Sequence, residues 1–149
     1  WSQVPLDSFI NFEAPPMAPL DLSPSRDLLA VCNTAAARLE IFDVSGATPV
    51  HQRSIPVGYD PVSAEFRTES EIWVVNFTSD SVSIVDLAVG AVAHTFDTDN
   101  EPADVVFAGA PQRGFVSCSQ SSTVLVFDPA NRNAAPTRIA MPDDAPRLM

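Results

Sequence analysis

A regular spacing of prolines is the feature that most limits what this chain can fold into. Four prolines that follow polar turns are separated by 42, 41 and 44 residues: Pro19, Pro61, Pro102 and Pro146. A period near 40 residues is typical of proteins in which one supersecondary unit is repeated and stacked on its neighbours. The chain is therefore predicted to consist of similar units in series.

Each unit contains two apolar runs at a constant distance. The first run ends at Asn33, Asn76 or Cys118, and an aspartate that closes the second run follows ten residues later in all three units. Val, Ile, Phe and Trp dominate the runs, and Ser, Thr, Asp and Ala separate them, which is typical of strands and hairpins rather than helices. The runs occupy residues 30–33, 73–76 and 115–118, followed by 39–43, 82–86 and 124–128.

The spacing predicts four strands in each unit. In the second unit they cover about 61–67, 71–76, 82–87 and 91–97. A repeated four-stranded antiparallel sheet is the blade of a β-propeller. The whole chain, 1–149, is therefore predicted to be an all-β partial propeller with blade 1 at about 13–58, blade 2 at about 59–98, blade 3 at about 99–143 and a fourth blade beginning at 146.

Three recurrent aspartates have a structural explanation. Asp43, Asp86 and Asp128 each end a third strand and begin a turn, where a carboxylate can accept a hydrogen bond from the backbone N–H two residues further on. A catalytic group would not be needed in every blade, so we interpret them as turn residues. The alternating pattern of the third strands also predicts which side chains are buried between blades: Leu39, Ile41, Val82, Ile84, Val124 and Val126.

Composition excludes some classes of partner. The formal net charge of −11 opposes binding to nucleic acid and to anionic lipid. The apolar runs are far shorter than the roughly 20 residues needed to cross a bilayer, so no membrane span is expected. Cys32 and Cys118 lack the spacing of zinc, redox or haem sites; lying in the first and third blades, they are predicted to be buried and unpaired.

The repeated units resemble a known family of repeats. The order of a proline and an apolar strand, an aromatic residue with Val-x-Asn, and an alternating strand ending in Asp resembles the YVTN β-propeller repeat, most closely over residues 73–86. The first unit has Ala30 in the aromatic position, and the third has Cys118 in place of Asn. The resemblance implies a place among lactonase-like and quinoprotein-like propellers, whose members include periplasmic and surface proteins.

The number of units implies an incomplete ring. Propellers close with about four to eight blades, so three blades are expected to be the N-terminal part of a larger ring whose remaining blades are required for closure. Residues 1–12, which include Phe9, Ile10 and Phe12, are a possible outer strand that closes the ring against the last blade.

Motifs of catalysis are absent from the sequence. There is no nucleophile elbow, zinc-binding helix motif, phosphate loop or dinucleotide fingerprint. His51 and His94 fall in predicted fourth strands at positions that are not equivalent, which favours a surface role over a metal or acid–base role. No catalytic residue and no cofactor-binding residue is therefore assigned, and no cofactor is evident apart from a possible Ca²⁺ ion.

Acidic residues gather in the predicted loops between blades. Asp97, Asp99 and Glu101 alternate in a way that resembles the oxygen ligands of Ca²⁺, although the glycine and the distal Glu of an EF-hand are missing. The loops that lead into successive blades should open on one face of the ring near the central channel, which gives a candidate binding face. Its residues are Asp60, Asp99, Glu101, Asp143 and Asp144. The alternative is that these are ordinary solvated loops.

Two functions follow as hypotheses. The first is a propeller module of an exported protein, periplasmic or extracellular, that binds a protein or a small-molecule ligand at its face without catalysis in this segment. The second is a fragment of a propeller enzyme, either a lactonase-like hydrolase or a periplasmic redox enzyme, whose active site lies outside these residues.

Overall fold

Each unit of the repeat folds as one four-stranded antiparallel sheet. The computed structural model describes residues 16–142, and its three sheets have the strand orders β1-β2-β3-β4, β5-β6-β7-β8 and β9-β10-β11-β12. This confirms the predicted all-β fold of propeller blades. The bounds are β1 Leu20–Leu22, β2 Leu28–Asn33, β3 Arg38–Asp43, β4 Val50–Pro56, β5 Pro61–Phe66, β6 Glu71–Asn76, β7 Ser81–Asp86, β8 Ala91–Asp97, β9 Pro102–Ala108, β10 Arg113–Cys118, β11 Thr123–Phe127 and β12 Thr137–Ala140, with one short 3-10 helix, η2, at Thr34–Ala36.

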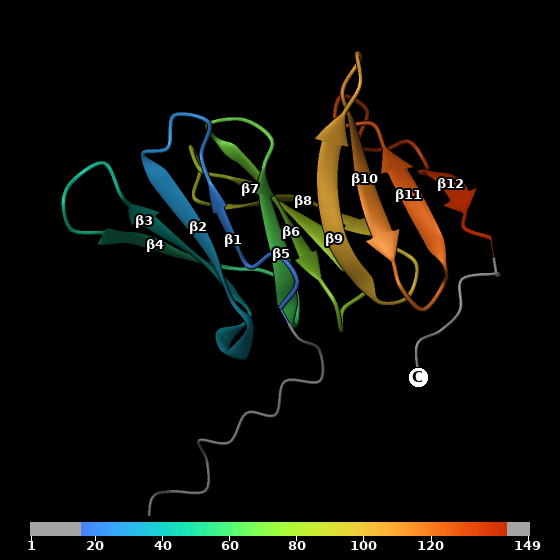
Figure 1. Ribbon diagram of the computed structural model, residues 1–149, viewed down its shortest axis with the longest axis horizontal. Helices are drawn as coiled ribbons and strands as arrows, with labels where there is room; N and C mark the ends of the chain where they lie inside the picture. Colours follow the sequence, from blue (N-terminus) through green and yellow to red (C-terminus); the bar gives the residue numbers. More distant parts are fainter. Residues whose placement is uncertain (1–15, 143–149) are drawn as a thin grey trace, which may run out of the picture.

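The three sheets stand side by side in chain order (Figure 1). They meet along their first strands: the backbone N–H of Met17, just before β1, donates to the carbonyl of Val62 on β5 at 2.9 Å, and Ala18 forms a parallel bridge with Ser63. We call the sheets blades 1, 2 and 3. The expected start of a fourth blade at 146 and the possible closing strand at 1–12 lie outside the described residues.

Blade 2 is covered on both faces, because the alternation of its strands sends apolar side chains in both directions. The core between blades 1 and 2 contains Ala30, Cys32, Leu39, Ile41, Ile55, Ala64, Phe66, Ile72, Val74 and Val85. The core between blades 2 and 3 contains Val62, Trp73, Val75, Val82, Ile84, Phe96, Val105, Val116, Cys118, Leu125 and Phe127. These two cores hold the blades together.

The prediction of third-strand residues buried between blades is correct in blades 1 and 2, whereas in blade 3 these residues face the side where no further blade lies among the described residues. Leu39, Ile41, Val82 and Ile84 are buried, whereas Val124 and Val126 are only half-buried. In β11 the residues that face blade 2 are Leu125 and Phe127, so Val124 and Val126 point to the opposite face, which no described residue covers. Other large apolar side chains are exposed on the outer blades, including Leu20 and Leu22 of β1 and Val106 and Ile139 of blade 3.

The three turn aspartates act as predicted. Oδ1 of Asp43, Asp86 and Asp128 accepts a hydrogen bond from the backbone N–H two residues further on, at 3.0, 2.8 and 3.0 Å. In the tips between second and third strands the left-handed residues are Ala37, Asp80 and Ser122. Asn76, at the end of β6, is buried, and its amide donates to the hydroxyls of Ser81 and Ser83.

The two cysteines are free and buried, as the sequence predicted, because Cys32 belongs to β2 and Cys118 to β10 with blade 2 between them. Burial raises the pKa of Cys32 to about 12, which leaves almost no thiolate at neutral pH. Within residues 16–142 we find no helix that combines the length and the hydrophobicity of a membrane span.

Candidate functional site

The loops that join one blade to the next lie at the same end of the structure as the tips between second and third strands. The backbone N–H of Phe77 donates to the carbonyl of Asp60, that of Thr98 to Asp80, and that of Ser119 to Glu101, each at 2.9 Å. We call this end the linker-loop face. It comprises the linker loops 57–60 and 98–101 and the tips 34–37, 77–80 and 119–122.

Asp60 and Glu101 occupy equivalent positions on the linker-loop face. Each lies directly before the proline that begins a first strand, with φ of 52° and 56°, although a residue before proline prefers the extended region. The carboxylate of Asp60 accepts a hydrogen bond from Thr78, and Oε2 of Glu101 accepts one from Ser119 at 3.3 Å. Each linker loop is therefore fastened to the tip of the blade that it enters.

Asp99 is neutralised by a cation of its own blade. Arg138 donates to both of its carboxylate oxygens, at 2.5 and 3.0 Å, and Thr123 donates to Oδ2 at 3.0 Å. These hydrogen bonds, that of Arg138 first, lower the pKa of Asp99. Asp80, which the sequence analysis did not single out, accepts from the backbone N–H of Glu101 at 2.9 Å and so links blade 2 to the loop into blade 3.

The structure does not bring the three expected calcium ligands together. Asp97 lies at the end of β8 and is exposed, whereas Asp99 turns to Arg138 and Glu101 to Ser119. Over residues 16–142 no three His, Cys, Asp or Glu side chains gather in a way that could hold a metal ion. Two further residues expected at the binding face, Asp143 and Asp144, lie outside the described residues.

The first strands add acidic groups that sequence reasoning missed. Asp21 of β1 accepts from the backbone N–H of Phe66 at 2.7 Å, and Asp104 of β9 accepts from the hydroxyl of Ser63 at 2.6 Å. Burial raises the pKa of Glu65 on β5, and the charges of Asp21 and Asp104 raise it further. Three successive first strands therefore bring carboxylates close enough to repel one another.

A bulge in β5 changes the position of Glu65 relative to Asp21. Asp21 pairs with Ala30, and Glu65 pairs with Trp73, the equivalent residue of blade 2. Asp21 lies two residues after its proline and Glu65 four residues after its own, and the register of β5 shifts between Pro61 and Ser63. Counting from the prolines therefore does not align them.

At the end opposite the linker-loop face, Glu71 is the centre of a cluster of charged and hydrogen-bonding side chains. It accepts from Arg67 at 2.5 and 2.9 Å, from the indole of Trp73 at 2.8 Å and from Arg132 of blade 3 at 2.8 Å. Burial alone would raise the pKa of Glu71, but the hydrogen bonds of Arg67 and Trp73 and the charges of Arg67 and Arg132 lower it. The cluster fastens blade 2 to blade 3.

Replacing Glu71 with Gln is expected to lower the free energy of unfolding by roughly 1–3 kcal/mol at pH 7, as for the loss of hydrogen bonds to a charged group. Because the folded pKa of Glu71 lies below its unfolded value, about 4.3, this stability is present above pH 4.3 and is lost as the pH falls through the folded pKa.

Urea unfolding between pH 7 and pH 3 tests this expectation, with the exposed Glu69→Gln as the matched control. The difference in free energy of unfolding between wild type and Glu71→Gln should become smaller below about pH 5, because protonation of Glu71 is linked to folding. A difference that stays constant over this range would contradict a stabilising role of the Glu71 charge.

The two histidines lie on fourth strands, as expected. Nε2 of His51 on β4 is 2.8 Å from Oε2 of Glu40, and its ring packs edge-on against Phe42. His94 on β8 packs against Phe96. Burial opposes ionisation of Glu40, but hydrogen bonds, that of His51 first, lower its pKa. Both rings are thus engaged in packing on their own blades.

Comparison with known proteins identifies the fold and no family. No protein-family model matches the sequence, and no curated protein sequence matches it. Among solved structures the chain is similar to Kuenenia stuttgartiensis hydrazine synthase, with a TM-score of 0.74 and 18% identity over 91% of this chain and 38% of that one.

Two further structures are similar. A functionally unknown protein from Desulfotomaculum acetoxidans DSM 771 has a TM-score of 0.66 and 19% identity over 85% of this chain and 42% of that one. A putative 6-phosphogluconolactonase from Bacteroides uniformis ATCC 8492 has a TM-score of 0.67 and 16% identity over 85% of this chain and 44% of that one. The chain thus spans less than half of each of these proteins, and it shares with them the arrangement of propeller-like blades.

Proposed function

We propose that this chain is part of a ligand- or protein-binding propeller of an exported protein, and that it binds through the linker-loop face. The observation that supports the proposal is an excess of carboxylates without cations. Among residues 16–142 the ion pair of Arg138 with Asp99 is the one found at this face. Within the described residues no cation forms an ion pair with Asp60, Asp80 or Glu101 at this face.

The partner that fits this arrangement is a cation or a basic segment of another protein. Negative potentials add where several carboxylates face one concave, low-dielectric surface. At the linker-loop face Asp60 and Glu101 lie in successive linker loops, and Asp80 accepts a hydrogen bond from the backbone N–H of Glu101. A lysine-rich ligand at the linker-loop face would supply the cations that Asp60, Asp80 and Glu101 lack among the described residues.

Calorimetric titration with tetralysine and, separately, with Ca²⁺ tests the proposal. Asp60→Asn and Glu101→Gln remove charge while keeping the side-chain shape, and Asn tolerates the left-handed backbone of position 60. Each change is expected to weaken tetralysine binding up to roughly fivefold and to reduce its dependence on salt. Asp86→Asn is the matched control, because Asp86 holds a turn at the opposite end.

Equal affinities of wild type and both variants for tetralysine would overturn the proposal and would reduce the linker-loop face to solvated loops. So would an equal loss in the Asp86→Asn control, because it would show that net charge matters and position does not. Binding of Ca²⁺ that falls in Asp60→Asn and Glu101→Gln alone would identify a metal ion as the ligand of this face.

The second candidate function is a propeller enzyme with catalytic groups on other blades, either a lactonase-like hydrolase or a periplasmic redox enzyme. It is favoured by the names of two similar structures, a hydrazine synthase and a putative 6-phosphogluconolactonase. Hydrolysis of 6-phosphogluconolactone by the full protein, or a haem absorbance band in it, would support this candidate. A full protein that binds tetralysine and shows neither property would favour the binding module.

A further inference from the structure

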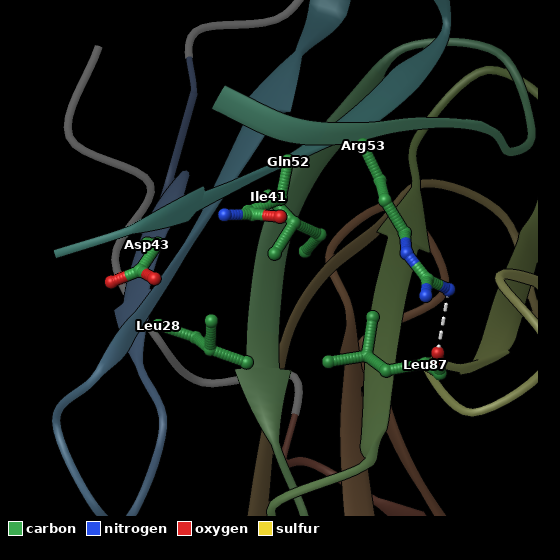
Figure 2. Close-up of a pocket in the computed structure, with 6 residues that line it drawn as sticks. All are labelled: Leu28, Ile41, Asp43, Gln52, Arg53 and Leu87. Carbon is green, nitrogen blue, oxygen red and sulfur yellow. Dashed lines mark hydrogen bonds between the residues drawn. The ribbon is translucent and has the colours of Figure 1, made fainter. Parts of the chain in front are cut away.

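A pocket of about 280 Å³ opens between blades 1 and 2, at the end opposite the linker-loop face. Figure 2 shows its lining: Leu28, Ile41 and Leu87 provide apolar surface, while Asp43 and Arg53 lie at opposite ends with Gln52 between them. The side chains come from the ends of β2 and β3, from β4, and from the residue that follows β7. The pocket thus combines an apolar floor with one anionic and one cationic end.

At the corresponding corner between blades 2 and 3 an arginine of blade 3 reaches the residue equivalent to Leu28. Leu28 pairs with Asp43 as Glu71 pairs with Asp86, so Leu28 and Glu71 are equivalent. Between blades 2 and 3, Glu71 holds Arg132, which arrives from the long loop 128–136 of blade 3. Between blades 1 and 2 the equivalent loop is only 87–90. The pocket is open because blade 2 supplies no side chain to occupy it.

The cationic end of the pocket is held in position. Nη1 of Arg53 donates to the carbonyl of Leu87 at 2.7 Å, and the guanidinium lies against Gly90, where an added Cβ would be 2.5 Å from Nη1. Within residues 16–142 Arg53 forms no ion pair. A guanidinium with donors to spare binds a carboxylate in a fixed geometry.

Asp43, at the anionic end, also has no ion pair within the described residues. Oδ1 of Asp43 holds its own turn by accepting from the backbone N–H and the hydroxyl of Ser45, at 3.0 and 2.6 Å. An ammonium group at this end would meet an uncompensated carboxylate, and the amide of Gln52 between the two ends can both donate and accept hydrogen bonds.

From this arrangement we propose that the pocket between blades 1 and 2 binds a short apolar peptide with free ends. Its carboxylate lies at Arg53, its ammonium group at Asp43, its peptide group at Gln52 and its apolar side chain on Leu28, Ile41 and Leu87. Opposite charges at the two ends of an apolar floor, with an amide between them, match the chemistry of such a ligand. The site is separate from the linker-loop face.

An NMR titration of the full protein with the tripeptide Ala-Leu-Ala tests this proposal, because chemical shifts report weak binding and also its place. The free peptide is expected to shift the amide signals of Leu28, Leu87 and Gly90. Amidation of its carboxyl end, or acetylation of its amino end, should each weaken binding roughly fivefold, as for loss of one exposed charge contact. Equal binding of the free and the doubly blocked peptide would overturn the assignment.

Variants then assign the two ends of the ligand. Arg53→Gln should weaken binding of the free peptide roughly fivefold and abolish the preference for a free carboxylate over an amide. His94→Gln is the matched control, since His94 has the same position on blade 2 as Arg53 on blade 1. Loss of that preference in the control, or its survival in Arg53→Gln, would sink the proposal.

A second variant, Leu28→Glu, tests the proposal independently if Arg53→Gln fails to fold. Leu28→Glu gives blade 1 the residue that blade 2 carries at the equivalent position, and it places a carboxylate on the apolar floor. Binding of Ala-Leu-Ala should fall by at least tenfold, on the order expected for an unpaired polar group at an apolar contact. Asp60→Asn should leave it unchanged, which separates this site from the linker-loop face; unaltered binding in Leu28→Glu would contradict the pocket assignment.

Discussion

Replacing Trp73 with alanine is expected to lower the free energy of unfolding by about 3–5 kcal/mol, the cost of removing a large buried aromatic side chain. Trp73 has no exposed surface, and its ring packs against Phe96, Phe107 and Phe127 with centroids 5.2, 5.0 and 6.2 Å away. The change also removes the indole hydrogen bond to Glu71. Urea unfolding followed by circular dichroism gives the measurement.

Gly114 of blade 3 faces the ring of Trp73 and allows a second test of this contact. A Cβ at Gly114 would lie 2.7 Å from the indole, so Gly114→Ile alone should cost about 1–3 kcal/mol through overpacking. At the equivalent positions of the other interface stand Ala30 and Ile72. The double variant with Trp73→Ala and Gly114→Ile therefore copies that pair. Its loss in free energy of unfolding should be smaller, by at least about 1 kcal/mol, than the sum of the losses in the two single variants.

Strict additivity in this double-mutant cycle would contradict the pairing of Trp73 with Gly114 across blades 2 and 3. Phe115→Ala is the matched control for Trp73→Ala, because Phe115 has the equivalent position in blade 3 but lies on the uncovered face and is only half-buried. Its loss should cost clearly less than that of Trp73.

Ile84→Ala is expected to lower the free energy of unfolding by about 2–5 kcal/mol, as for other buried aliphatic truncations. Ile84 has no exposed surface and lies in the core between blades 2 and 3. Val126 has the equivalent position in blade 3, but it faces away from blade 2 and is half-buried. In the 149-residue chain Val126→Ala should therefore cost less than about 1 kcal/mol.

A loss below about half a kcal/mol for Ile84→Ala would contradict the register of the blades, since surface substitutions fall in that range. If Val126→Ala proved as costly as Ile84→Ala, the outer face of blade 3 would have to be covered in solution by further blades or by another copy of the chain. Both variants can be measured in the same urea series.

The candidate site was predictable only in outline. Asp60 and Glu101 could be found because they precede the prolines that mark the repeat. Asp99 was predicted as part of an acidic face, but the structure pairs it with Arg138, 39 residues away. Glu71 and Arg132, 61 residues apart, left no local pattern at all, because a long-range ion pair depends on how two blades are placed and not on spacing along the chain.

The sequence contains part of the information that predicts the pocket between blades 1 and 2. The longer loop 128–136, compared with 87–90, is visible once the repeats are aligned. That the shorter loop leaves a pocket lined by Arg53 and Asp43 depends on the packing of one blade on the next. Sequence comparison of the units could therefore indicate where the blades differ, but not what the difference encloses.

The number and order of strands in each blade can be read from the repeat in the sequence. The period of the prolines, the ten-residue step from the first apolar run to the aspartate and the composition of the runs were sufficient to predict four-stranded antiparallel blades, and the strand limits in blade 2 agree with the structure to within one residue. These features are local, because hydrogen-bonded hairpins and their turns are specified by residues near each other in the chain.

Which face of each blade is covered depends on how the blades pack against one another. In β11 the run Val124 to Phe127 is apolar at every position, so alternation along the strand does not tell which side chains face blade 2. The packing of blade 3 on Trp73 buries Leu125 and Phe127 and leaves Val124 and Val126 outside. Val126 and Ile84 occupy equivalent positions and face away from the preceding blade, but blade 3 covers Ile84 and no described residue covers Val126. Burial therefore depends on whether a neighbouring blade lies against an apolar face, and a strand pattern does not contain that information.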